Sequence, residues 1–195
     1  SGEVVRVQID QRGLFADGHA FERSGPYERI SGKMFLEIDP DNPANAVVAD
    51  LEFAPRNARG RVECWTDFFL LKPVDAARGN RRILFDVHNR GNQLAVRSFY
   101  EAPSESANDP RTLEDAGNGF LMREGYTVVW CGWNGDVVED GKNRLLCGLP
   151  VARRDGDVIT GKIHVEICVV ERVHSRTFLW SPWGTSAAYP SVSVV

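Results

Sequence analysis

Short apolar runs separated by turn-forming residues dominate the N-terminal part of the chain and predict β-strands. Four extended runs share this pattern, at residues 4–9, 33–38, 47–53 and 61–71. The second run ends at the Asp-Pro-Asp-Asn-Pro cluster of residues 39–43, which strongly favours a turn. Residues 54–60 have turn-forming character and separate the last two runs, so these two runs are predicted to form a hairpin with a long loop.

A different pattern begins at residue 82. Residues 83–87 and 126–131 are almost continuously apolar, as expected of strands covered on both faces. Between them, residues 112–124 have helical spacing, with Gly117 and Gly119 as interruptions and a glycine at the predicted end. A strand, a crossover helix and a second strand predict a parallel βαβ unit.

Two alternating segments lie near the end of the chain. Residues 162–171 place apolar side chains on one face and predict a half-buried antiparallel strand. Residues 191–195 begin another alternating strand where the sequence stops, whereas natural termini more often trail off in polar residues. We therefore expect the N-terminal part of a longer protein. The predicted fold is β-rich α/β, with a β-rich N-terminal layer over residues 1–81. Residues 82–195 then start an α/β core with an antiparallel strand insertion.

Composition and charge narrow the range of partners. Hydrophobic residues make up 43% of the 195 residues and charged residues 26%, which is typical of a soluble globular protein. The formal net charge of -4 gives no basic field for nucleic acid or for an anionic membrane surface. No apolar run approaches the roughly 20 residues of a membrane span. The N-terminus has no signal-peptide pattern, so a cytoplasmic location and export after removal of a leader both stay open.

The cysteines and histidines give no pattern of a metal site. The four cysteines, Cys64, Cys131, Cys147 and Cys168, are widely spaced, and the four histidines are scattered. We expect reduced structural cysteines, with one disulfide as the open alternative, and no metal or cofactor. There is also no P-loop, no dinucleotide-binding glycine motif after a strand and no H-E-x-x-H motif.

No nucleophile of a serine hydrolase can be assigned. Such an enzyme carries its serine in a G-x-S-x-G turn between a strand and a helix, and this motif does not occur in the sequence. Ser186 comes nearest, but its surroundings lack the closing glycine, a preceding buried strand and a following helix. Ser24, before Gly25 and Pro26, is better explained as a turn residue.

The loop after residues 83–87 is the first candidate site. The apolar run leads directly into His88, Asn89, Arg90 and Gly91. In α/β-hydrolases the loop after the third strand supplies one backbone N–H group to the oxyanion hole, and a glycine allows the backbone to approach the substrate closely. The alternative is that His88 and Asn89 only cap the strand end and hydrogen-bond the turn.

The segment after residues 126–131 is the second candidate. Trp133 and Asn134 follow the carboxyl end of a predicted parallel strand, where open α/β sheets bind their ligands. These side chains could line a pocket for substrate, or the aromatic ring could pack over the sheet edge. A third aromatic group, Trp180, Trp183 and Tyr189, offers a patch for a sugar or partner, or packs against a further part of the protein.

Several ordered motifs resemble a poorly characterised group of bacterial α/β-hydrolase-domain proteins. The motifs are GPYERISG at 25–32, APRNA at 54–58, RGN at 78–80, VHNRGN at 87–92 and EGYTVVWCGW at 124–133. The resemblance implies ester or related acyl hydrolysis, with the serine, acid and histidine downstream of residue 195. It also implies that the loop His88, Asn89, Arg90 and Gly91 contributes to an oxyanion hole. Where lipases have His-Gly-Gly-Gly, this loop differs, so the N–H donor stays open and Arg90 could instead bind an anionic part of a substrate.

Three functions follow as hypotheses. The first is the N-terminal part of a serine hydrolase for a small ester, without its nucleophile and inactive alone. The second is a β-rich ligand- or carbohydrate-binding module that uses Trp130, Trp133, Trp180 or Trp183. The third is a non-catalytic interaction domain that forms a homo-oligomer through an exposed strand edge such as residues 191–195.

Overall fold

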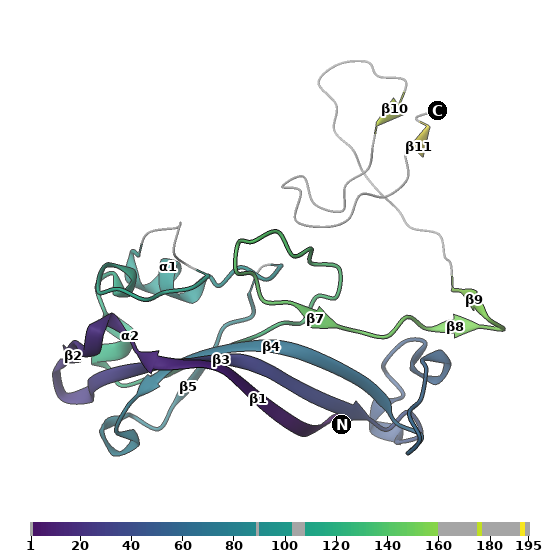
Figure 1. Cartoon of the computed structure of the whole chain (residues 1–195), viewed down its shortest axis with the longest axis horizontal. Coiled ribbons are helices and arrows are strands. Elements are labelled where there is room, and N and C mark those ends of the chain that lie inside the picture. The colour runs from purple at the N-terminus through teal and green to yellow at the C-terminus, as the bar shows by residue number, and fades with distance from the viewer. Residues whose placement is uncertain (1, 89, 103–107, 160–174, 177–191, 194–195) are drawn as a thin grey trace.

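The computed structural model describes residues 2–88, 90–102, 108–159, 175–176 and 192–193, and shows a β-rich mixed α/β architecture (Figure 1). In the described part, one seven-stranded sheet has the order β1-β3-β4-β6-β5, with β2 added to β3 and β7 to β4. Its strands are β1 (Gly2–Leu14), β2 (Ala20–Phe21), β3 (Gly25–Ile38), β4 (Val62–Pro73), β5 (Ile83–Phe85), β6 (Thr127–Cys131) and β7 (Cys147–Gly148). The small pairs are β8 (Arg153–Arg154) with β9 (Asp157–Val158), and β10 (Ser175–Arg176) with β11 (Val192–Ser193).

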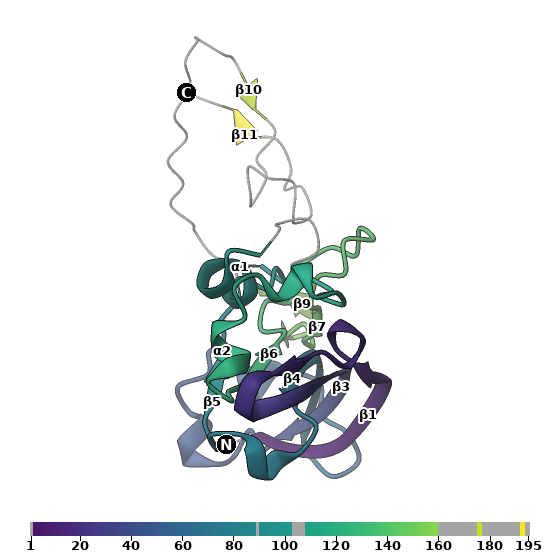
Figure 2. The same ribbon diagram turned by 90° about the vertical axis from the view of Figure 1, so that its left-hand side faces the viewer.

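Strands β1, β3 and β4 form a long antiparallel unit that bends as a whole (Figure 2). The predicted strand at residues 4–9 is part of the longer β1, and the run 61–71 corresponds closely to β4. Strand β3 extends the predicted run 33–38 by eight residues toward the N-terminus, through the GPYERISG segment. Because β4 pairs with both β3 and β6, the residues before and after position 81 share one sheet.

The predicted hairpin between residues 47–53 and 61–71 is wrong. Residues 47–53 form turns and the 3-10 helix η4 (Leu51–Phe53), and β4 pairs with β3 instead. The run does not alternate in burial as a strand would, because Val47 is 90% exposed and Val48 47%, while Leu51 is buried. Asp50 also adopts a left-handed conformation with φ 57°, which a strand does not accommodate.

The parallel strand pair predicted from the two apolar runs is confirmed, but the expected coverage of both faces is wrong for β5, where Ile83 is 68% and Phe85 53% exposed. Ile83 pairs with Thr127 and Phe85 with Val129 in parallel register. The crossover between β5 and β6 contains α1 (Ala95–Tyr100), the 3-10 helix η6 (Glu114–Ala116) and α2 (Phe120–Arg123).

The predicted helix over residues 112–124 is confirmed only in part. It is divided into η6 and α2, because Gly117 and Gly119 take positive φ angles of 53° and 68°. Helix α1 was not predicted.

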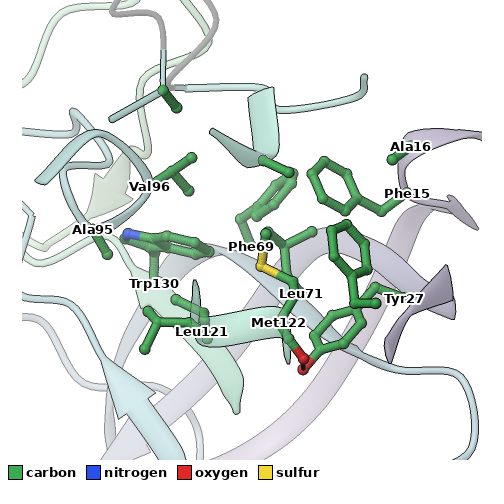
Figure 3. Close-up of a cluster of buried hydrophobic side chains, with 14 of the residues drawn as sticks. Phe15, Ala16, Tyr27, Phe69, Leu71, Ala95, Val96, Leu121, Met122 and Trp130 are labelled. Atoms are coloured by element: carbon green, nitrogen blue, oxygen red, sulfur yellow. Dashed lines mark hydrogen bonds between the residues drawn. The ribbon is translucent and has the colours of Figure 1, made fainter. Parts of the chain in front are cut away.

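A single apolar cluster fills the space between the sheet and the two α-helices (Figure 3). The sheet contributes Phe21, Tyr27, Phe69, Leu71, Val128 and Trp130, the helices contribute Ala95, Val96, Leu121 and Met122, and Phe15 comes from the segment after β1. The Tyr27 hydroxyl donates to the carbonyls of Met122 and Tyr126 at 3.1 and 2.9 Å. These bonds join β3 to the end of the crossover, just before β6 begins.

Several predictions extend beyond the residues that can be described. The predicted strand at residues 162–171 lies outside them, and of residues 191–195 only the two residues of β11 lie within them. Among the described residues, no helix has both the length and the apolar character needed to cross a membrane.

Candidate functional site

Asp86 organises the carboxyl end of β5. One of its carboxylate oxygens, Oδ2, accepts hydrogen bonds from the backbone N–H groups of Leu94 and Ala95 at 2.9 and 2.7 Å. The same oxygen accepts from the Trp130 indole at 2.5 Å. A carboxylate at this position therefore joins the end of β5 to the start of α1 and to β6. The sequence reasoning missed Asp86, although an acidic residue at the end of an otherwise apolar run was a visible signal.

His88 fixes the shape of the loop after β5. Its side chain is buried, with 1% exposed, and its Nδ1 accepts a hydrogen bond from the N–H of Gly91 at 2.7 Å. An accepting Nδ1 carries no proton, so the neutral ring has its proton on Nε2. Burial lowers the pKa of His88, while the Cys131 carbonyl and the Asp86 carboxylate act in the opposite direction.

Gly91 is required by two features of the loop. It has φ +84°, and a Cβ atom would come within 2.8 Å of both the Arg144 Cβ and the Leu145 carbonyl oxygen. The Gly91 carbonyl accepts from the Leu145 N–H at 2.9 Å. Since the Gly91 N–H already donates to His88, this group holds the loop together, and an oxyanion donor from the loop would have to be a different group.

The loop after β6 is tied to the loop after β5. The Trp133 indole donates to the His88 carbonyl at 2.9 Å, and the two ring centroids lie 6.0 Å apart. The Arg90 guanidinium pairs with the Asp136 carboxylate at 2.9 Å. The Asn134 side-chain oxygen accepts from the Asp136 N–H at 3.2 Å, which closes a local turn.

The structure therefore brings together most of the predicted site. His88, Arg90, Gly91, Trp133 and Asn134 meet at the carboxyl ends of β5 and β6, while Asn89 lies outside the described residues. Trp133 is 55% exposed and can contact a ligand. Arg90 already has a carboxylate partner, so its charge is compensated in this arrangement.

The use of Trp130 for ligand binding is wrong. Its side chain is completely buried against Phe69, and its indole N–H is bound by Asp86. Trp180, Trp183, Tyr189 and Ser186 lie outside the described residues.

The described residues contain no hydrogen-bonded pair of nucleophile and base. Neither of their two histidines, His19 and His88, is hydrogen-bonded to a serine hydroxyl or a cysteine thiol, and the Ser24 hydroxyl donates to the Arg123 carbonyl at 3.0 Å. Within the same residues, no cluster of three or more metal-ligating side chains is present, and Cys64, Cys131 and Cys147 are free thiols. These residues do not by themselves form a catalytic triad.

Comparison of the chain with protein-family models, with curated proteins and with solved structures finds no match. The functional interpretation therefore rests on the residues and their geometry.

Proposed function

We propose that this chain supplies sheet strands and substrate-facing loops of a serine α/β-hydrolase that acts on a small ester, and that the chain itself does not carry the nucleophile. The observation that carries the proposal is the parallel pair of β5 and β6, whose following loops are joined by the Trp133–His88 and Arg90–Asp136 contacts. In open α/β sheets, ligands bind at the carboxyl ends of parallel strands, where strand order changes. Here β6 lies between the parallel β5 and the antiparallel β4.

In this proposal the two loops position the substrate for attack by a serine. Asp86 joins the loop to α1 and β6, and the buried His88 side chain fixes the loop through its bond with Gly91. Preorganised donors lower the barrier to acyl transfer because they do not have to reorient as charge develops on the substrate oxygen. The exposed face of Trp133 would contact an apolar part of the ester.

Two measurements test the proposal. The purified 195-residue chain should neither hydrolyse p-nitrophenyl acetate nor react with a fluorophosphonate probe of serine nucleophiles. Turnover that disappears in a Ser186→Ala variant would contradict it, because the nucleophile would then lie within the chain.

The protein expressed from its own gene provides the second test. Its intact mass should exceed the 21.7 kDa of this chain, and the same probe should label a serine beyond residue 195. A mass equal to that of the chain, with no labelling, would remove the hydrolase interpretation.

A further inference from the structure

A polar cavity of about 330 Å³ lies on the face of the sheet that also carries the core, beside the loops of the candidate site. Gln11, Arg29 and Ser31 from β1 and β3 form part of its wall, and Gln93, Asn108 and Leu145 close it from the loop side. This volume lies at the lower end of the range of small-molecule pockets, which is about 300–1,000 Å³. Its lining differs from that of the two loops described above, because Trp133, His88 and Arg90 do not contribute to it.

The buried polar atoms of this lining include a donor and an acceptor that have no hydrogen-bonding partner among the described residues. They are Nε of Arg29, a donor, and Oε1 of Gln93, an acceptor. Arg29 is 9% exposed and Gln93 is completely buried. Since nearly all buried polar atoms in native proteins are hydrogen-bonded, this donor and acceptor indicate a missing partner that can both accept and donate.

The remaining atoms of these two side chains are firmly held. One terminal nitrogen of Arg29 donates to Asp109 at 2.5 Å and to Gln11 at 3.1 Å. The Gln93 side-chain amide donates to the Asn108 carbonyl at 3.0 Å, and the Asn108 side chain accepts from the Gln93 backbone at 2.9 Å. These contacts orient both side chains, so Nε of Arg29 and Oε1 of Gln93 are preorganised.

The arginines that line the cavity, Arg29, Arg111 and Arg144, all have carboxylate partners, which favours a neutral ligand over an anion. Arg29 and Arg111 both pair with Asp109, at 2.5 and 2.6 Å. Asp67 pairs with Lys33 at 2.5 Å. A charged ligand would have to compete with these existing pairs, whereas a neutral polar ligand leaves them intact.

We propose that this cavity binds a small neutral polyhydroxylated ring, namely a monosaccharide or a cyclic polyol. A hydroxyl group both accepts and donates, so hydroxyls of one ring can accept from Arg29 Nε and donate to Gln93 Oε1. The proposal does not depend on the hydrolase function, because it requires no nucleophile and is tested by binding alone.

The test uses the 195-residue chain with D-glucose, D-galactose, D-mannose and myo-inositol as probes. Binding is measured by saturation-transfer NMR and titration calorimetry. At least one probe should bind with a Kd of about 1 mM or lower, which is a typical weak specific affinity. Arg29→Lys keeps the positive charge but removes Nε, and Gln93→Met keeps the side-chain length but removes the acceptor. Each should weaken binding about tenfold, or about 1.4 kcal/mol.

Arg12→Lys is the matched control. It makes the same chemical change on β1, but Arg12 pairs with Glu28 at 2.6 Å and does not line the cavity. Its Kd should stay within about twofold of the unchanged protein, a difference well below 1 kcal/mol. Circular dichroism establishes whether each variant is folded.

A second measurement needs no variant. In ¹H–¹⁵N spectra of the unchanged protein, the Nε–H signal of Arg29 should shift on addition of the bound probe, while that of Arg12 should not. Three outcomes overturn the proposal. They are the absence of binding at a probe concentration of about 10 mM, preferential binding of sodium acetate or ammonium chloride over all four probes, and binding that leaves the Arg29 signal unchanged. The first outcome would mean that only water occupies the cavity.

Discussion

Replacement of Gly91 by alanine should destabilise the protein more than the same change at any unconstrained turn. Two separate costs arise in the folded state. The first is the backbone conformation, since Gly91 has φ +84° and L-residues pay about 1–3 kcal/mol in this region. The second is steric, because the new Cβ would lie 2.8 Å from both the Arg144 Cβ and the Leu145 carbonyl oxygen. Overpacking of this kind typically costs about 1–3 kcal/mol.

A smaller effect acts in the opposite direction. Alanine restricts the unfolded chain more than glycine does and thereby favours folding by about 0.4–1 kcal/mol. The expected net loss for Gly91→Ala is therefore about 2–4 kcal/mol, a large part of the roughly 5–15 kcal/mol that stabilises a typical domain.

Gly60→Ala separates the two costs. Gly60 has a similar φ of +72°, but nothing lies within 4 Å of the position of its Cβ. This control should lose only about 1 kcal/mol, so the two variants should differ by about 1–3 kcal/mol, which is the steric cost alone. Urea unfolding followed by tryptophan fluorescence measures both. Losses for Gly91→Ala and Gly60→Ala that agree within about 0.5 kcal/mol would refute the close approach of the loop to residues 144–145.

Three further predictions concern charged and titratable groups. Asp86→Asn should cost about 1–3 kcal/mol in urea unfolding, because three N–H donors lose a charged acceptor, whereas the exposed cap Asp75→Asn should change stability by less than about 0.5 kcal/mol. Burial lowers the pKa of His88, so the unfolded state binds more protons below pH about 6.5, and stability should fall as the pH decreases toward the folded pKa. The His88→Asn variant keeps an acceptor for the Gly91 N–H but should lose this dependence of stability on pH, as measured by thermal melts at several pH values. An identical dependence in the variant would contradict the burial of a neutral ring. Burial alone would raise the pKa of Glu28, but the bonds of Glu28 to Arg12 and Lys72 lower this pKa. Ionised Glu28 therefore stabilises the folded state above pH about 4.3, and this stabilisation is lost in more acidic solution. Glu28→Gln should flatten this acidic part of the stability curve, and a curve unchanged by the substitution would exclude such a role.

The elements that the sequence predicted correctly are those whose stability depends on local pattern. The parallel pair of β5 and β6 follows from two continuous apolar runs and a long polar crossover between them. Strand β4 likewise follows from its own composition. The run 47–53 has similar apolar content, yet it forms no strand: Val47 and Val48 are exposed, and β3 occupies the position beside β4.

The N-terminal half of β3 shows why long-range partners limit such predictions. Its residues Glu28 and Arg29 interrupt the apolar alternation, although both are buried. Each is compensated by residues distant in sequence, as in the ion pair between Arg29 and Asp109, which are 80 positions apart. The polar cavity depends on the same partners and was therefore not visible in the sequence. The two loops of the candidate site could be located, since glycine, histidine and tryptophan follow predicted strand ends directly.

The loop after β5 connects the two proposed sites, and this connection has a measurable consequence. The Gly91 carbonyl accepts a hydrogen bond from the N–H of Leu145, which lines the polar cavity. Gln93, two residues after Gly91, lines the same cavity, and its side-chain oxygen is unpaired. A ligand that binds only the folded state at about 100 times its Kd adds about 2.7 kcal/mol to stability. A polyol that binds in the cavity should therefore raise the melting temperature of the unchanged protein and of Arg12→Lys, but much less that of Arg29→Lys. It should also protect Gly91→Ala less than Gly60→Ala, because alanine at position 91 displaces the segment that closes the cavity. Equal protection of the two glycine variants would show that the loop and the cavity behave independently.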